Sequence, residues 1–182
     1  MKIWKLGFCS EEYDYLIPEP DWDIDKIRTF DGRSHKKDWK TVKVVGLEPE
    51  KGLDFGNAVR MYSSLPVFDD KAKAILESYC NAFVEFLPLE NPKRKFWAVN
   101  IIAVLDCIKY EESEYKTFPD SKKIMYFKKY SFRPEVVENV HIFKLKDLPR
   151  APFFVSDTFK RTVEDNNLTG FNFELVWNSE EK

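Results

Sequence analysis

The chain has 182 residues, of which 43% are hydrophobic and 16% aromatic, and its formal net charge is −2. So many bulky apolar side chains suffice for one packed core, and they exclude a disordered or low-complexity chain. The slight negative charge disfavours nucleic-acid binding, which relies on a basic footprint. We therefore expect one domain over residues 1–182, with a core over 1–177 and a polar tail over 178–182.

The cysteines and the apolar segments predict a protein of the cytoplasm that does not enter a membrane. Cys9, Cys80 and Cys107 are odd in number and far apart, which favours reduced thiols over a disulfide framework. Acidic residues within 7–14 interrupt any signal-peptide core near the N-terminus. The apolar run 96–108 is too short for a membrane span and contains polar residues, so we expect it in the core.

Short runs rich in aromatic and β-branched residues predict strands along the whole chain. Seven such runs are found: Lys2 to Phe8, Thr41 to Leu47, Phe83 to Leu89, Phe96 to Leu105, Ile124 to Phe132, Val140 to Leu145 and Phe171 to Trp177. Asp69 or Asp70 can cap one helix, and Asp157 can cap a second. The predicted fold is α+β, with a mostly antiparallel sheet of about seven strands and two main helices.

The two helical segments align when the sequence is shifted by 87 positions. The shift matches Asp70 with Asp157, Lys73 with Lys160, Leu76 with Val163, Glu77 with Glu164 and Phe86 with Phe173. Both segments therefore predict a strand-helix-strand unit. The common needs of such a unit explain the match, and so does a duplication; the sequence leaves both open.

An acidic segment near the N-terminus lacks regular periodicity. Residues 10–25 contain seven acids and no base, and residues 11–38 match neither strand nor helix spacing. We expect a loop-rich excursion that wraps the domain, with Trp22 and Trp39 available as anchors.

No assembled catalytic, cofactor or metal site is expected from the motifs. A phosphate-binding loop and Cys-x-x-Cys are absent, and His35 and His141 are the only histidines. The run Asp21 to Asp25 resembles the start of a calcium loop, but Lys26 and Gly32 occupy positions that require Gly and Glu. The letters Pro20-Asp21 and then Asp38-Trp39-Lys40 match a metal-dependent nuclease motif, which needs both elements on adjacent strands. A nuclease-like enzyme stays as the alternative.

Lysines and aromatic residues alternate from Lys122 to Arg133. This pattern occurs in single-strand nucleic-acid platforms. It also occurs in a strand with one face in the core and lysines along an exposed edge, and the net charge favours this interpretation.

Several short segments, in this order, carry a family resemblance: Met1 to Leu6, Asp21-Trp22-Asp23, Phe30-Asp31-Gly32-Arg33, Leu47 to Gly52, Pro66-Val67-Phe68, Phe153 to Asp157 and Leu168 to Phe171. The chain resembles the eleventh immunity-protein family of bacterial polymorphic toxin systems, from its first residue to about Trp177. The resemblance implies a cytoplasmic protein, encoded beside a toxin, that binds the toxin domain and blocks it in the producing cell. It implies no catalytic residues.

For such a binder, we expect Asp21, Trp22, Asp23 and Asp31 to meet a basic toxin surface, with charge steering the encounter and the tryptophan providing contact area. In the alternative interpretation, Trp22 and Trp39 hold the loop on the core and the acids only face water. A general protein-interaction domain remains a further alternative, and self-association is left open.

Overall fold

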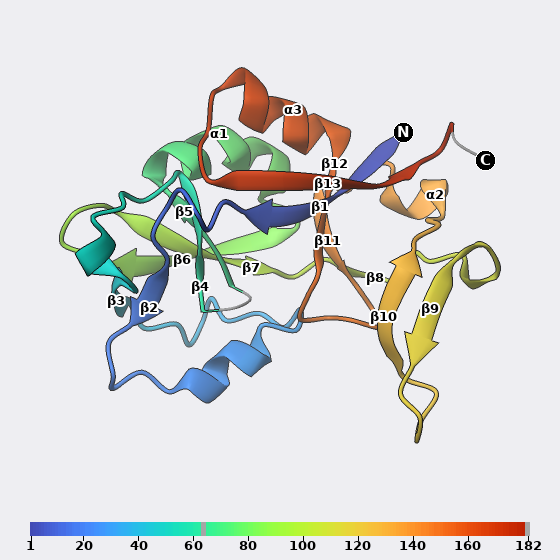
Figure 1. Cartoon of the computed structure of the whole chain (residues 1–182), viewed down its shortest axis with the longest axis horizontal. Helices are drawn as coiled ribbons and strands as arrows, with labels where there is room; N and C mark the ends of the chain where they lie inside the picture. The colour runs from blue at the N-terminus through green and yellow to red at the C-terminus, as the bar shows by residue number, and fades with distance from the viewer. Residues whose placement is uncertain (63–64, 181–182) are drawn as a thin grey trace.

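A computed structural model describes residues 1–62 and 65–180 of the chain (Figure 1). Six strands close into a barrel in the order β2-β3-β6-β7-β5-β4. These strands are β2 (Leu16–Pro18), β3 (Val42–Gly46), β4 (Ala58–Met61), β5 (Leu65–Asp69), β6 (Val84–Glu90) and β7 (Phe96–Ile101). The pairs β2·β4 and β3·β6 are parallel, and the other barrel pairs are antiparallel.

A second, five-stranded sheet has the order β13-β1-β12-β11-β8. It contains β1 (Lys2–Phe8), β8 (Val104–Leu105), β11 (Ile142–Leu145), β12 (Phe153–Ser156) and β13 (Phe171–Asn178). Only the pair β8·β11 is parallel in this sheet. The strands β9 (Glu114–Thr117) and β10 (Ile124–Lys129) form a separate antiparallel hairpin.

Three α-helices and three short 3₁₀-helices complete the described chain. The α-helices are α1 (Asp70–Cys80), α2 (Pro134–Val137) and α3 (Asp157–Asp165), and the 3₁₀-helices are η1 (Ile24–Thr29), η2 (Pro49–Lys51) and η3 (Tyr110–Glu112). Asp69 caps α1 through the backbone N–H of Ala72, and Ser156 caps α3 through that of Phe159. None of the helices among the described residues has the length and apolar character needed to cross a membrane.

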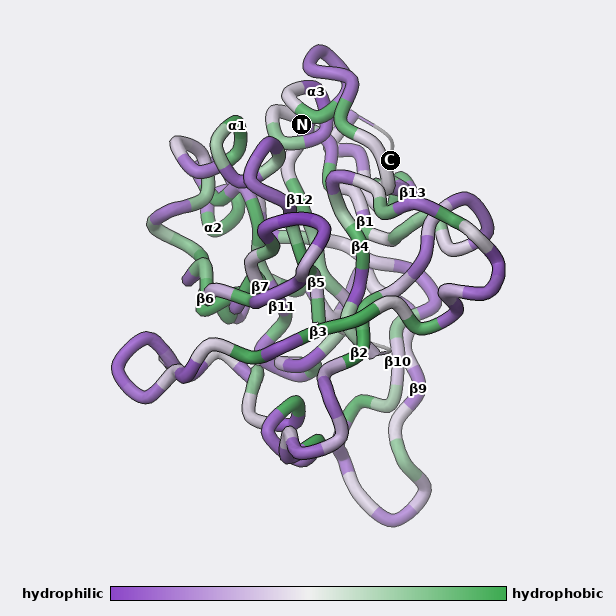
Figure 2. The backbone as a smooth tube through the Cα atoms, turned by 90° about the vertical axis from the view of Figure 1, so that its left-hand side faces the viewer, coloured by the Kyte–Doolittle hydropathy of each residue, from purple (hydrophilic) through white to green (hydrophobic). Residues whose placement is uncertain are grey.

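Three apolar clusters pack the barrel, the five-stranded sheet and the helices together. One fills the barrel, around Met61, Val67 and Phe96. The second lies where α1 and α3 pack on the two sheets, and the third covers the opposite face of the five-stranded sheet. Successive side chains of a strand point to opposite faces of its sheet. In β12, Phe153 therefore packs in the cluster under the helices and Phe154 in the cluster on the opposite face. Figure 2 shows hydrophobic residues along the strands and hydrophilic residues in most connecting loops.

The two predicted strand-helix-strand units are present, and they share one topology. In β5-α1-β6, strand β7 lies between β5 and β6 and is antiparallel to both. In β12-α3-β13, the same central place is taken by β1, which comes from the other end of the chain. The helices α1 and α3 lie side by side over the sheets (Figure 1).

The side chains of the two units also correspond. The indole N–H of Trp97 donates to Asp70 at 2.7 Å, and that of Trp4 donates to Asp157 at 3.1 Å. The ammonium of Lys73 lies 4.8 Å from the Trp97 ring, and that of Lys160 lies 4.7 Å from the Trp4 ring. Each lysine also forms an ion pair one helical turn on, Lys73 with Glu77 and Lys160 with Glu164. The 87-residue shift thus relates two equivalent packing arrangements, in which the lysines serve to cover a tryptophan.

One prediction about the fold is wrong. The chain is α+β, but it does not form a single, mostly antiparallel sheet of about seven strands. Its described residues form thirteen strands in three sheets, one of them a closed barrel, and parallel pairs occur in two of the three. The predicted tail includes residues 181 and 182, which lie outside the described residues, while Ser179 donates its backbone N–H to Met1 at 2.9 Å.

Candidate functional site

The acidic excursion leaves the barrel after β2 and returns to it at β3. The segment 11–38, which was expected to lack strands and helices, contains the short strand β2 as well as η1, and between β2 and β3 the described regular element is η1. Asp23 caps η1 by accepting the backbone N–H of Asp25 at 3.0 Å. Because β2 and β3 are paired, the two ends of the excursion lie together on the barrel wall.

Aromatic residues attach the excursion to the barrel. Trp22 stacks on Tyr62 with ring centroids 6.3 Å apart, and the indole of Trp39 donates to the carbonyl oxygen of Pro88 at 3.0 Å. Phe30 is buried and contacts the rings of His35 and Trp39. Both tryptophans are half-buried against the barrel core, so they anchor the loop as predicted.

Polar contacts from β6 and β7 hold the middle of the excursion. The Glu85 carboxylate accepts hydrogen bonds from the Ser34 hydroxyl and the His35 backbone N–H. Burial raises the pKa of Glu85, but these bonds and one from Asn100 outweigh burial and leave the pKa below its ordinary value. Asn100 also donates to the carbonyl oxygen of Arg33 at 2.9 Å. The carboxylate is therefore held ionised as a fixed acceptor for the loop.

Lys144 on β11 ties the excursion to the five-stranded sheet. Its side chain is buried, and the ammonium donates to the carbonyl oxygen of Phe30 at 2.6 Å. Burial lowers the pKa of Lys144 to about 8, against the opposing effect of Asp31 nearby. The attachment of the excursion thus includes a charge whose burial costs free energy in the folded state.

This burial predicts a defined pH dependence of stability. Below pH 8, Lys144 is charged in both states and the folded state bears the full cost of burying it. Between pH 8 and about 10.5 the unfolded state binds more protons, so this residue makes the free energy of unfolding rise by about 1.4 kcal/mol per pH unit. Urea unfolding over this range should show that the free energy of unfolding of the wild type rises with pH relative to that of Lys144→Met. Parallel pH profiles would contradict the assignment, since the other titrating groups are common to both proteins.

The excursion and β3 enclose a cleft of about 650 Å³. Its apolar lining residues, which we call the apolar floor, include Trp22, Phe30, Trp39 and Val42. Its charged lining residues are Glu19, Asp21, Asp23, Lys26, Asp38, Lys40 and Lys43. Within the described part of the chain, none of these seven side chains forms a salt bridge. An apolar floor with unpaired charges around it is suited to binding a complementary surface.

The structure brings three of the four predicted partner-binding residues to this cleft. Asp21, Trp22 and Asp23 line it, while Asp31 is not among its lining residues. Asp31 instead forms a two-bond pair with Arg33, which lowers the pKa of Asp31. Lys26 and Lys40 were considered only for a calcium loop and a nuclease motif, and Lys43 was not considered, although all three bases follow the acidic run in the sequence.

Three residues of the nuclease-like motif, Asp21, Asp38 and Lys40, also line the cleft. Nuclease chemistry of this kind requires these residues on adjacent strands. Here they lie in the irregular parts of the excursion instead. In residues 1–62 and 65–180, no group of three or more His, Cys, Asp or Glu side chains is arranged to hold a metal ion.

The remaining thiols and imidazoles have structural partners. Cys80 and Cys107 are buried, and burial raises the pKa of each thiol to about 12. His35 contacts Thr29, whereas His141 contacts the Ser156 hydroxyl at 2.9 Å. Burial lowers the pKa of His141. These surroundings are typical of packing residues.

In a comparison with known protein families, a family model matches the barrel from β3 onward and the strands β8, β11, β12 and β13 of the second sheet, but not β1 or β2. Residues 37–178 match the family described as Immunity protein family (Imm11). The matched region begins after Asp21, Trp22, Asp23 and Asp31. No curated protein matches the chain. Because the match extends over well more than half of the sequence, this chain belongs to the Imm11 immunity protein family.

Proposed function

We propose that the chain binds a cognate bacterial toxin domain and neutralises it in the cytoplasm of the producing cell. The observation that carries this proposal is the family match over residues 37–178. The cleft supports it, because unpaired charges around an apolar floor favour the steering and docking of a protein partner.

We assign the first contact with the toxin to the acidic side of the cleft. Asp21 and Asp23 are exposed where the excursion leaves β2, and Trp22 lies between them. Trp22 is half-buried against Tyr62, so little conformational entropy is lost when a partner covers its remaining surface. Asp31 contributes indirectly, by fixing Arg33 and lying near Lys144 at the base of the loop.

The double variant Asp21→Asn, Asp23→Asn should slow association with the toxin domain several-fold at low salt and flatten its salt dependence. Asparagine keeps an oxygen that can cap η1, so the variant removes charge and preserves the loop. Stopped-flow or biosensor association rates between about 50 and 300 mM salt measure the effect.

The matched control is Glu135→Gln, Glu138→Gln, which removes two exposed charges from the region of α2. It should leave the association rate near the wild-type value. If both double variants associate at the wild-type rate, the contact surface lies elsewhere on the chain.

Growth of cells tests the proposed function itself. The toxin domain encoded beside this chain should arrest growth when expressed alone, and co-expression of the chain should restore growth. Arrest that persists with the folded chain present at equal abundance would refute neutralisation. Magnesium-dependent degradation of nucleic acid by the purified chain, abolished by Lys40→Ala, would favour the nuclease alternative instead.

A further inference from the structure

The hairpin β9–β10 projects from the molecule as a two-stranded arm (Figure 1). Ile124, beside the turn, and Phe127, in the middle of β10, attach the arm by packing into the cluster that covers the five-stranded sheet. Tyr115 lies against Phe127 on the same face, with ring centroids 5.7 Å apart. Two-stranded hairpins are marginally stable alone, so this anchoring explains how the arm stays formed beyond the sheets.

The arm also exposes several large apolar or aromatic side chains. Large side chains exposed here are Tyr115, Phe118, Met125 and Tyr126, and Phe118 at the turn is 47% exposed. All four positions of β9 are exposed. Single exposed apolar residues are common, but a group on one projecting element is typical of an interaction surface.

The same arm carries five exposed lysines: Lys116, Lys122, Lys123, Lys128 and Lys129. Among the described residues, none of the five forms a salt bridge. Only Lys116 has a close aromatic contact, 6.0 Å from the Tyr126 ring. The charge of this surface is therefore available to a partner.

We propose that the β9–β10 arm is a second contact surface for the toxin domain, and that it docks on an acidic patch around an apolar pocket. Phe118 enters the pocket, and Lys122 and Lys123 meet the acidic rim. This inference rests on the proposed function, and it adds the position of a contact and the charge of the toxin surface that receives it.

A protein surface fits the arm better than nucleic acid does. Acids accompany the lysines on this segment: Glu111, Glu112 and Glu114 precede Lys116, and Asp120 lies between Lys116 and Lys122. This mixture breaks the continuous basic stripe that phosphate binding requires, and the whole chain carries a net charge of −2. The arm also lacks arginine from Lys109 to Lys129, whereas bidentate phosphate recognition favours arginine.

The arm and the excursion project toward the same end of the molecule. In Figure 1, the blue coil of η1 and the tip of the β9–β10 hairpin both lie along the lower side. One toxin domain can therefore contact both, with a basic area opposite Asp21 and Asp23 and an acidic area opposite Lys122 and Lys123. Such paired opposite charges fix the orientation of a complex as well as its strength.

Binding to the purified toxin domain tests the arm with three variants. Lys122→Glu, Lys123→Glu should reduce the association rate about tenfold at low salt, and Phe118→Ala should increase the dissociation rate about tenfold. The matched control is Lys93→Glu, Lys95→Glu, which makes the same charge change on exposed residues between β6 and β7. Circular dichroism establishes that each variant is folded.

The outcomes separate the arm from the proposed function. If the wild type binds the toxin domain and the arm variants bind equally well, the arm is excluded and the proposed function stands. Equal weakening by both lysine pairs would also overturn the inference, since net charge alone would explain it. If the wild type binds duplex DNA and the arm variants lose this binding but bind the toxin domain normally, the arm is assigned to nucleic acid instead. A wild-type chain that does not bind the toxin domain would overturn both proposals.

Discussion

Gly170→Ala should lower the free energy of unfolding by roughly 3–5 kcal/mol, among the largest effects of any single substitution in this chain. Gly170 has φ +87°, and a Cβ built there would lie 1.9 Å from the carbonyl oxygen of Ala58. The backbone cannot retreat, because Ala58 donates to Thr169 and Cys9 donates to Gly170, each at 3.0 Å. Thermal unfolding should shift downward by roughly 10 °C.

Gly52→Ala is the matched control for this substitution. Gly52 also has a positive φ of 66°, but nothing lies within 4 Å of a Cβ at this position. Alanine there should cost only about 1 kcal/mol, for the left-handed conformation alone. Equal losses in the two variants would mean that the contact between β4 and the loop before β13 does not constrain the fold.

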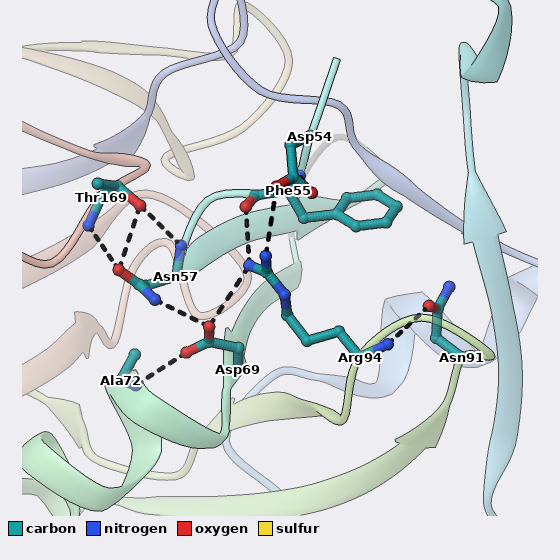
Figure 3. A network of polar contacts seen from close by, with 8 residues as sticks. All are labelled: Asp54, Phe55, Asn57, Asp69, Ala72, Asn91, Arg94 and Thr169. Atoms are coloured by element: carbon teal, nitrogen blue, oxygen red, sulfur yellow. Dashed lines mark hydrogen bonds and ion pairs between the residues drawn. The ribbon is translucent and has the colours of Figure 1, made fainter. Parts of the chain in front are cut away.

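Asp69→Ala should cost roughly 3–4 kcal/mol because this carboxylate joins three elements (Figure 3). It caps α1 through Ala72 at 2.9 Å, accepts from Asn57 at 2.8 Å and lies 3.5 Å from the Arg94 guanidinium. Asn57 in turn accepts two hydrogen bonds from Thr169 in the loop before β13. Alanine removes the cap and leaves buried donors without their acceptor.

The equivalent position in the second unit provides the control. Ser156 caps α3 through Phe159 at 3.2 Å, and His141 is its other side-chain contact. Ser156→Ala should therefore cost about 1 kcal/mol, the usual value for a lost cap. Urea unfolding of both variants measures the difference, and similar losses would show that the Asp69 network adds nothing to the cap.

Each predicted run contains a strand, because each has period-two alternation or a dense apolar run, but the run Phe96 to Leu105 divides into β7 in the barrel and β8 in the second sheet. Strands outside these seven runs lack that signal for physical reasons; β5 was expected only as the first strand of its strand-helix-strand unit. β5 is buried at all five positions and contains Pro66, whereas β9 is exposed at all four. Neither alternates, so periodicity cannot identify them. Barrel closure also depends on β2, which has three residues and pairs with β4 only at Leu16 and Met61.

The helices α1 and α3 and the similarity between their units were predictable, since caps and helical spacing are local, whereas the one-turn helix α2 was not expected. The one local error is the α3 cap, where Ser156 takes the capping place and Asp157 begins the helix. By contrast, the role of β1 as the central strand of the second unit joins residues about 150 positions apart, which no local pattern reports.

For the candidate site, sequence reasoning found the acidic side and missed the rest. The run of acids and the tryptophans indicated Asp21, Trp22 and Asp23, which the cleft brings together. Asp31 was grouped with them by charge, but its adjacent Arg33 pairs with it. The burial of Lys144 was not predictable, because lysine in a strand is usually exposed and its acceptor, Phe30, is far away in sequence.

The proposed neutralisation of a toxin by binding can be measured with purified proteins. The most direct test is a calorimetric titration of the purified toxin domain with the purified chain, with toxin activity assayed in the same samples. We predict saturable binding, with toxin activity falling in proportion to the complex and lost at saturation. A toxin domain that stays fully active in the presence of excess folded chain would contradict the claim.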